Sequence, residues 1–288
     1  MRDGWTLRRF VQEVRGTPRG ALLWLGGRGD ILEKYLEAFD HWAARGWHVT
    51  SVDWRGQGGS GRLLSDAAVG HIDDFGTWIE DLADVAGAWR KDVQGPFVLA
   101  GHSMGGHLLL RALVERRVTA DKAVLVAPML GFDTPGLPFR AARALSAVLG
   151  RISPQRRAWP DNERPSAPGA SRQALLTRCD ARYADELWWK SADPQLALGP
   201  PSWGWVAASY RSVARLRRPG VLEAVDTPVL LLGSEGDRLV SAEAIRTAAA
   251  RLPHAQLHMY GREVPHELLR DIDETRLHAL TLIDEFLA

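Results

Sequence analysis

The chain has 288 residues, of which 45% are hydrophobic and 25% charged, and 36 Lys+Arg against 35 Asp+Glu give a net charge of +1. This composition is typical of a folded globular protein and excludes a disordered or collagen-like chain. The near-neutral total gives no indication of a nucleic-acid partner. Cys179 is the single cysteine, so an intrachain disulfide is excluded.

The first residues, MRDGWTLRRFVQEV, lack the apolar stretch of a signal peptide. No stretch of the sequence approaches the ~20 apolar residues that a membrane-spanning helix needs. We therefore expect a cytoplasmic protein, and the sequence indicates no protein partner.

Short apolar runs alternate with helical stretches along most of the chain. Trp5–Val14 alternates in polarity and is predicted as an antiparallel edge strand, and Gln256–Tyr260 as a last strand. Five further runs are rich in Val and Leu without alternation, as strands buried on both faces are. They are Ala21–Leu25, His48–Trp54, Phe97–Gly101, Ala123–Ala127 and Pro228–Gly233.

Amphipathic segments lie between these predicted strands. Apolar residues spaced by three and four predict a helix over Phe75–Trp89, with Asp73 or Asp74 as its N-cap. The same spacing predicts helices over Tyr35–Ala43 and Ile272–Leu287. This alternation implies an α/β fold with a mostly parallel sheet covered by helices on both faces.

The alternation stops between about Gly131 and Val225, where the sequence is rich in proline and predicts no strand. We expect residues 131–225 to form a helical cap inserted between two late strands of a core made of residues 1–130 and 226–288. Short helices are predicted in the cap over Phe139–Leu149, Ser171–Arg178, Arg182–Lys190 and Trp203–Arg217. Tryptophans of the cap form either a small aromatic core or a substrate-binding wall. Those predicted to bind substrate are Trp188, Trp189, Trp203 and Trp205.

The near-neutral total charge conceals a basic cap. Residues 131–225 have 14 Arg and Lys against 8 Asp and Glu, which leaves 22 basic and 27 acidic residues elsewhere. Arg211, Arg215, Arg217 and Arg218 crowd one helix end. They form either a solvated face or a surface that attracts anionic lipid or a phosphate-bearing head group. Peripheral membrane contact through the cap therefore stays open.

The stretch Phe97–Gly106 reads FVLAGHSMGG and contains the pattern G-x-S-x-G around Ser103. A predicted strand precedes it and a helix-compatible run follows, which is the context of a nucleophile elbow. Small residues on both sides allow the sharp turn that exposes the hydroxyl. Ser103 is therefore the predicted nucleophile.

A serine hydroxyl needs a histidine base that is oriented by a carboxylate. On this kind of sheet the chain order is Ser, then Asp or Glu, then His. Asp237 follows the strand Pro228–Gly233 and is the predicted acid, with Glu235 as the alternative. His266 lies in the loop between the last strand and the last helix and is the predicted base. Three other histidines follow Asp237 and fit this place less well: His254, His258 and His278.

Acyl transfer also needs two donors for the oxyanion of the tetrahedral intermediate. The backbone N–H of Met104, directly after the nucleophile, is one predicted donor. The other is the backbone N–H of Arg28, in the glycine-rich loop that follows Ala21–Leu25. Glycines in this loop let the backbone approach the substrate closely.

A second glycine-rich segment, Gly56–Gly61, satisfies G-x-G-x-x-G. It is predicted as a loop, because no convincing helix opens after it and no acidic residue follows a second strand ~20 residues later. The sequence contains no Walker A motif, no H-E-x-x-H and no paired C-x-x-C, so we expect no cofactor and no metal.

Several stretches together resemble α/β-hydrolases of the monoglyceride lipase and bacterial lysophospholipase group. The stretches are LGGRGDILEKYLEAFDHWAARGWHVTSVDWRGQGGSGR, FVLAGHSMGG, VLVAPML, PVLLLGSEGDRLV and PHELLRD, and they cover about Ala21–Leu130 and Asp226–Leu287. The resemblance implies an α/β-hydrolase fold, a triad of Ser103, Asp237 and His266, and a cap domain. The chain departs from the group where Gly26-Gly27 stands in place of His-Gly at the start of the oxyanion loop.

The sequence thus predicts a serine hydrolase that cleaves carboxylic esters of monoacyl lipids, either lysophospholipids or monoacylglycerols, through an acyl-enzyme. A general carboxylesterase, a thioesterase or a small-amide hydrolase with the same triad is the alternative among enzymes. A binding protein that uses the α/β-hydrolase fold without catalysis is the alternative of another class.

Overall fold

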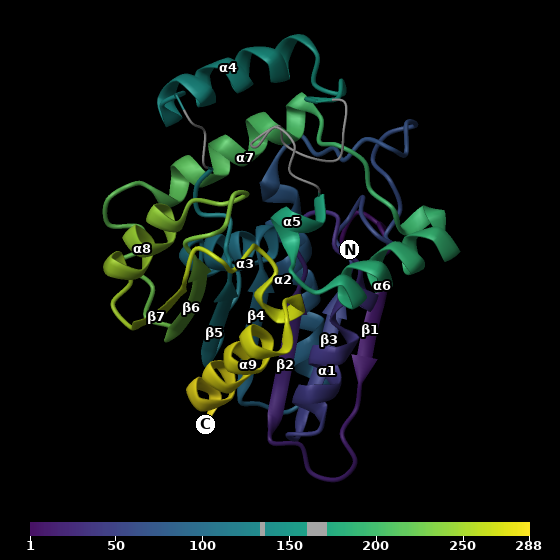
Figure 1. Cartoon of the computed structure of the whole chain (residues 1–288), viewed down its shortest axis with the longest axis vertical. Coiled ribbons are helices and arrows are strands. Elements are labelled where there is room, and N and C mark those ends of the chain that lie inside the picture. Colours follow the sequence, from purple (N-terminus) through teal and green to yellow (C-terminus); the bar gives the residue numbers. More distant parts are fainter. Residues whose placement is uncertain (133–135, 160–171) are drawn as a thin grey trace.

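The structure, a computed structural model, describes residues 1–132, 136–159 and 172–288 (Figure 1). The strands in the described part of the chain form a seven-stranded sheet in the order β1-β3-β2-β4-β5-β6-β7. β1 pairs antiparallel with β3, and the other neighbours are parallel. The strands are β1 (Arg9–Gln12), β2 (Gly20–Leu25), β3 (Trp47–Val52), β4 (Phe97–His102), β5 (Lys122–Val126), β6 (Val229–Ser234) and β7 (Ala255–Tyr260).

The sheet is mostly parallel and covered on both faces, as the sequence predicts. Side chains of β2 alternate between two apolar clusters, with Leu22 on the face of Phe39 and Leu280 and Leu23 on the face of Trp78. The helices outside the β5–β6 connection are α1 (Leu36–Ala43), α2 (Phe75–Asp92), α3 (Met104–Val114), α8 (Ala242–Arg251) and α9 (Asp273–Leu287). Burial on both faces explains why the inner strands lack polar alternation.

Two local features refine the predicted elements. Asp74, rather than Asp73, caps α2, because its carboxylate accepts a hydrogen bond of 2.6 Å from the amide of Gly76. The helix α8 has no counterpart among the elements expected from the sequence. Its sequence, AEAIRTAAAR, is mainly alanine and buries only Ile245 and Ala248, which gives a weak apolar pattern.

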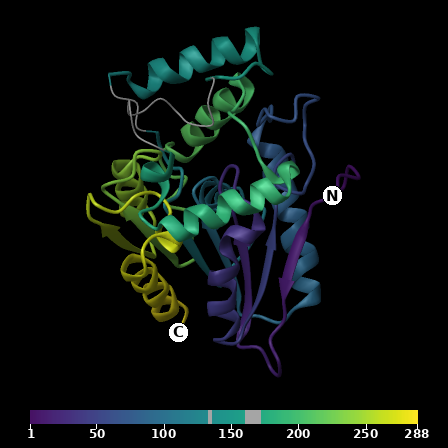
Figure 2. The same ribbon diagram turned by 45° about the vertical axis from the view of Figure 1, so that its right-hand side comes forward.

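Four α-helices of the described residues lie between β5 and β6: α4 (Phe139–Ile152), α5 (Arg172–Leu176), α6 (Asp180–Ala192) and α7 (Trp203–Leu216). The predicted helix Ser171–Arg178 begins at Ser171, which lies outside the described residues. Figures 1 and 2 both show α7 between α4 and the rest of the molecule. The segment 131–225 also includes residues outside the described ranges, and its limits as a cap stay a prediction.

Specific contacts fix these helices on the core. On α7, Ser212 Oγ lies 2.6 Å from His107 Nε2 and accepts a hydrogen bond of 3.0 Å from Arg111 Nη1, both on α3. On α5, the carbonyl of Leu176 accepts a hydrogen bond of 2.8 Å from the amide of Glu267. No helix within the described ranges has the length and apolar character needed to cross a membrane.

Candidate active site

Ser103 occupies a strained turn between β4 and α3. Its φ of 51° and ψ of −115° lie in a region that non-glycine residues rarely adopt. A methyl group added at Gly105 would lie 2.2 Å from the carbonyl oxygen of Leu25, and one at Gly101 would lie 2.7 Å from the carbonyl carbon of Gly105. The turn therefore requires glycine at both flanking positions of the G-x-S-x-G pattern.

Gly105→Ala is expected to destabilise the fold by about 3 kcal/mol or more, because the added methyl group meets backbone atoms that have no room to move. Gly87→Ala is the matched control, since Gly87 lies in α2 with no atom within 4 Å of an added methyl group. Alanine at that helical position is expected to stabilise by up to about 1 kcal/mol. Urea unfolding of both variants measures the difference, and equal midpoints would contradict this explanation of the motif.

Asp237 and His266 form a buried pair at the carboxyl edge of the sheet. His266 Nδ1 lies 2.5 Å from Asp237 Oδ2, and the two side chains are 4% and 0% exposed. The other carboxylate oxygen, Oδ1, accepts hydrogen bonds of 2.8 Å and 3.0 Å from the amides of Leu239 and Val240. The Nδ1–H of the imidazole donates to the carboxylate in this arrangement, which leaves Nε2 unprotonated and able to accept a proton.

The imidazole of His266 also lies next to the nucleophile turn. Its ring centroid is 4.7 Å from that of His102, the residue directly before Ser103. His266 and Ser103 line the same cavity without a hydrogen bond between them. Contacts between a nucleophile and its base are often long until the substrate binds.

The alternative acid and bases lie elsewhere. Glu235 forms an ion pair with Arg246 rather than with a histidine. His258 and His278 pack against each other with ring centroids 5.0 Å apart, and the carbonyl of His254 accepts a hydrogen bond from Val229. None of these histidines lines the cavity that holds Ser103 and His266 in the described part of the chain.

The loop after β2 passes directly beside Ser103, the predicted nucleophile. A methyl group added at Gly27 would lie 3.0 Å from Ser103 Cβ and 3.1 Å from His102 Nδ1, so glycine is needed for this close approach. Met104 is the first residue of α3, and its amide has no acceptor inside the helix. Within the described residues, the amides of Met104 and Arg28 donate to no backbone carbonyl outside the regular elements.

Asp30 holds the loop after β2, in which Gly26-Gly27 stands in place of the His-Gly pair expected from the resemblance. Its Oδ2 accepts hydrogen bonds of 2.6 Å from the amide of Gly27 and 2.6 Å from Tyr35 Oη. The same oxygen lies 3.0 Å from His102 Nδ1, and Lys34 Nζ donates to Oδ1 at 2.6 Å. Burial acts to raise the pKa of Asp30, but the positive charge of Lys34 and the hydrogen bond with His102 hold that pKa well below its usual range.

The segment Gly56–Gly61 supports the same loop from the other side. The Oε1 of Gln57 accepts a hydrogen bond of 2.7 Å from the amide of Gly29. Asp53, just before the segment, accepts 3.2 Å and 2.8 Å hydrogen bonds from the amides of Leu32 and Gly59. Sequence reasoning missed Asp30 and Gln57, although an acidic residue closing the GGRGD run was a usable signal.

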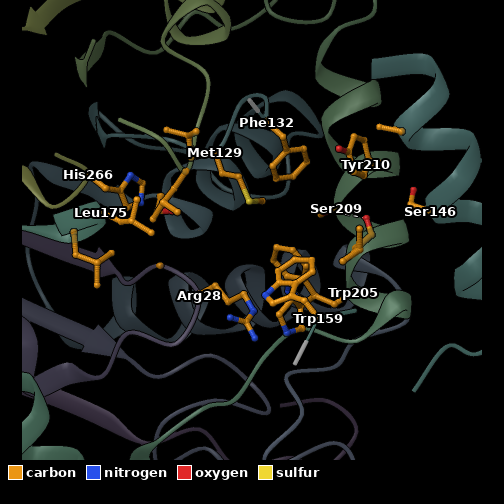
Figure 3. A pocket seen from close by; sticks show the side chains of 18 of the residues that line it. Arg28, Met129, Phe132, Ser146, Trp159, Leu175, Trp205, Ser209, Tyr210 and His266 are labelled. Atoms are coloured by element: carbon orange, nitrogen blue, oxygen red, sulfur yellow. Dashed lines mark hydrogen bonds between the residues drawn. The ribbon is translucent and has the colours of Figure 1, made fainter. Parts of the chain in front are cut away.

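A cavity of about 310 Å³ opens beside Ser103 and His266 (Figure 3). Its walls come from the nucleophile turn, the loop after β2, the residues after β5, and the helices α4, α5 and α7. Apolar and aromatic side chains make up much of its lining, among them Met129, Phe132, Trp159, Leu175, Trp203, Trp205 and Tyr210. A largely apolar cavity beside polar groups suits a ligand with one apolar tail.

The tryptophans predicted to bind substrate divide into two pairs. Trp203 and Trp205 line the cavity, whereas Trp188 and Trp189 do not. The reason is the position of α6, which presents Trp188 to solvent with 60% of its surface exposed. The two indoles pack edge to face, with centroids 4.9 Å apart. Trp159 lines the cavity instead and was not among the predicted site residues.

Comparison with known proteins gives the family. Residues 16–273 match the model of a hydrolase family described as serine aminopeptidase, S33. The chain therefore belongs to the S33 family of α/β-hydrolases. Lysophospholipase L2 of Escherichia coli (strain K12) is 31% identical to this S33-family chain over 278 residues, which cover 90% of the chain and 78% of the relative. Monoglyceride lipase of Rattus norvegicus is 23% identical and is covered over 86% of its length, against 96% of this chain.

The fold is also that of solved α/β-hydrolases. The crystal structure of monoacylglycerol lipase from Paleococcus ferrophilus superposes with a TM-score of 0.76 at 22% sequence identity, covering 98% of both chains. Among the described residues of the S33-family chain, no three His, Cys, Asp or Glu side chains are grouped to hold a metal ion.

We expect the pH profile of this S33-family chain to depend on His266. Burial acts to lower the pKa of His266, but the Asp237 carboxylate outweighs burial and raises it above the usual 6.5. Because the neutral imidazole accepts the proton, kcat/KM is expected to fall as pH drops through a value above 6.5. Asp237→Asn removes the negative charge that raises the pKa of His266, so the acid limb of this variant's pH–rate profile is expected at lower pH. A pH–rate profile with the limb at or below 6.5 in the unaltered protein would contradict this assignment.

Proposed function

We propose that this protein is a serine hydrolase that cleaves carboxylic esters of monoacyl lipids through an acyl-enzyme on Ser103. One observation carries the proposal: a strained serine turn and a buried Asp237–His266 pair meet at a largely apolar cavity. Strained turns are retained where the surrounding structure enforces them, commonly at catalytic sites. A binding protein has no use for this costly combination.

The geometry supports the following reaction. Ser103 Oγ attacks the ester carbonyl while His266 Nε2 takes the hydroxyl proton, and Asp237 stabilises the imidazolium. The oxyanion accepts hydrogen bonds from the amides of Arg28 and Met104. The intermediate collapses to the acyl-enzyme, and His266 returns the proton to the departing alcohol. Water, deprotonated by His266, then releases the fatty acid and restores Ser103.

The cavity favours a substrate with one acyl chain. Much of its lining is apolar and aromatic, which suits an alkyl tail, while the ester would lie beside Ser103. The relatives named lysophospholipase and monoglyceride lipase act, by those names, on lipids with a single acyl chain. Both supports agree on a monoacyl lipid ester as the substrate class.

Hydrolysis of a substrate panel tests the proposal. The panel contains p-nitrophenyl esters from acetyl to palmitoyl, lysophosphatidylcholine, monoolein, a matched thioester, and an aminoacyl amide for the aminopeptidase chemistry in the family description. We expect kcat/KM to be highest on monoacyl lipids and to rise with chain length among the p-nitrophenyl esters. Preference for the amide or for acetyl esters would contradict the substrate class.

We further propose that residues 131–225 act as a cap that brings the cavity to a lipid surface. On α4, Leu145, Val148 and Ile152 are 51%, 53% and 73% exposed, and Leu145 also lines the cavity. The helix has exposed arginines and no acidic residue, which favours anionic lipid. The cytoplasmic location predicted from the sequence stays a prediction.

Three of the four arginines predicted to attract lipid at the end of α7 have other contacts; Arg218 is the fourth. Arg211 donates a 2.5 Å hydrogen bond to the carbonyl of Asp73, Arg215 lies 3.5 Å from Glu115, and Arg217 stacks 4.3 Å over the ring of Phe139. The lipid-facing side is therefore assigned to α4. Co-sedimentation with neutral and anionic vesicles tests this assignment. The triple variant Leu145→Ser, Val148→Ser, Ile152→Ser should no longer bind the vesicles. Unchanged binding of that variant would contradict the assignment.

A further inference from the structure

The side chain of Arg28 is a partly buried cation that the proposed chemistry does not use. Its backbone amide serves the oxyanion, but its guanidinium lies in the cavity wall beside Trp205 (Figure 3). One nitrogen, Nη2, donates to the carbonyl oxygen of Gly199, and the guanidinium carbon lies 5.4 Å from the centroid of the Trp205 ring. The Nε is shielded from solvent and has no hydrogen-bond partner.

No carboxylate of the described residues lies within ion-pair distance of Arg28. This contrasts with the neighbouring buried cation Lys34, which contacts Asp30 and Glu267 at 2.6 Å each and Glu186 at 3.2 Å. A buried charge without a counter-ion is costly, and proteins normally avoid it. The Arg28 guanidinium therefore lacks a counter-ion, which favours the binding of an anionic group of a ligand beside it.

A second cation lines the same cavity. Arg172, at the start of α5, is close enough that its charge, together with burial as the larger cause, lowers the pKa of Arg28 from 12.5 to about 9. Asp30 and Glu267 also line the cavity, but both pair with Lys34, and Arg172 itself lies 3.7 Å from Glu186. Two arginines near each other, one of them without a carboxylate partner, favour the binding of a negatively charged group.

The position of Arg28 decides which part of the substrate would meet it. The preceding residue, Gly27, lies against Ser103, so the guanidinium is within one side chain of the ester being cleaved. An alkyl tail and a neutral glycerol carry no charge to offset a guanidinium. A phosphate ester near the scissile ester does, and its oxygens match the planar fork of arginine.

We propose that Arg28, assisted by Arg172, binds the phosphate of a lysophospholipid head group and so selects phosphorylated over neutral monoacyl esters. This inference rests on the proposed function. It assigns two separate roles to one residue, with the amide at the oxyanion and the guanidinium at the head group.

Matched short-chain substrates test the proposal. The probes are 1-octanoylglycerol and 1-octanoylglycerophosphocholine, which share the ester and differ in the phosphate-bearing head group. In Arg28→Gln we expect the ratio of kcat/KM for the phosphorylated over the neutral ester to fall about tenfold or more. Arg28→Lys keeps the positive charge but lacks the planar guanidinium, so the same kcat/KM ratio should fall less. Arg2→Gln is the matched control, because its side chain is 72% exposed and lies outside the cavity lining.

The outcome of this comparison is decisive in either direction. An equal loss on both substrates would assign Arg28 to the oxyanion loop alone and overturn the proposal, as would an unchanged ratio. Thermal unfolding of Arg28→Gln shows whether the fold survives loss of the contact to Gly199. Should Arg28→Gln unfold, Arg172→Gln gives the same ratio test, because Arg172 lies in α5 outside the oxyanion loop.

A binding measurement separates this proposal from the proposed catalytic function. In Ser103→Ala, we expect 1-O-octylglycerophosphocholine to bind about tenfold or more tightly than 1-O-octylglycerol. The difference should disappear when Arg28→Gln is added. A preference that persists would overturn the proposal even if the protein hydrolyses esters. Equally tight binding of inorganic phosphate alone would mark an independent anion site and overturn the head-group assignment.

Discussion

Ser103→Ala is expected to lower kcat on a monoacyl ester by about 10⁴-fold or more. The hydroxyl forms the covalent bond to the acyl group, and no other side chain of the strained turn supplies a nucleophile. The fold should persist, because alanine at this position adds no atom to the turn. Initial rates on 1-octanoylglycerol, with near-UV circular dichroism for folding, measure both.

Ser191→Ala is the matched control, since Ser191 is an exposed serine of α6. It should hydrolyse the ester at the unaltered rate. Activity of Ser103→Ala within tenfold of the unaltered protein would refute the nucleophile.

His266→Ala is expected to be about as damaging as Ser103→Ala, because the base and the nucleophile act as one unit. The double variant should therefore lose no more than either single one. Asp237→Asn should lose less, on the order of 10³–10⁴-fold, because it retains the base but not its preferred tautomer and orientation. Single-turnover rates on a p-nitrophenyl ester give the comparison without interference from product release.

His258→Ala provides the histidine control. Its ring packs against His278, outside the cavity lining, so its removal should change kcat by less than about threefold. A large loss of kcat in His258→Ala, together with an active His266→Ala, would identify His258 rather than His266 as the base.

The central features of the fold follow from local sequence patterns. Runs such as Ala21–Leu25 and Pro228–Gly233 predict buried parallel strands; the observed β2 begins one residue earlier, and β6 is shifted by one residue at both ends. Burial on both faces leaves a continuous apolar run, which is a strong signal. The parallel order of the strands then brings the residues that follow them to one edge. The predicted Ser103, Asp237 and His266 all lie at that edge.

Features that depend on how helices dock were harder to predict. Trp188 and Trp189 lie on α6, which contributes no residue to the lining of the cavity. Which side faces inward is set by contacts across the fold, such as the pairing of Lys34 with Glu186. The support of the loop after β2 by Gln57 likewise joins segments distant in sequence, whereas Asp30 lies only three residues from Gly27 and could have been found from the GGRGD run.

The most direct test of the account is labelling with a fluorophosphonate, followed by peptide mass spectrometry. We expect one stoichiometric adduct on Ser103, strongly slowed labelling in His266→Ala, and no labelling in Ser103→Ala. A monoacyl ester should compete with the fluorophosphonate and slow the labelling of Ser103. No adduct on Ser103, or an adduct on another serine at the same rate, would contradict an acyl-enzyme at this site.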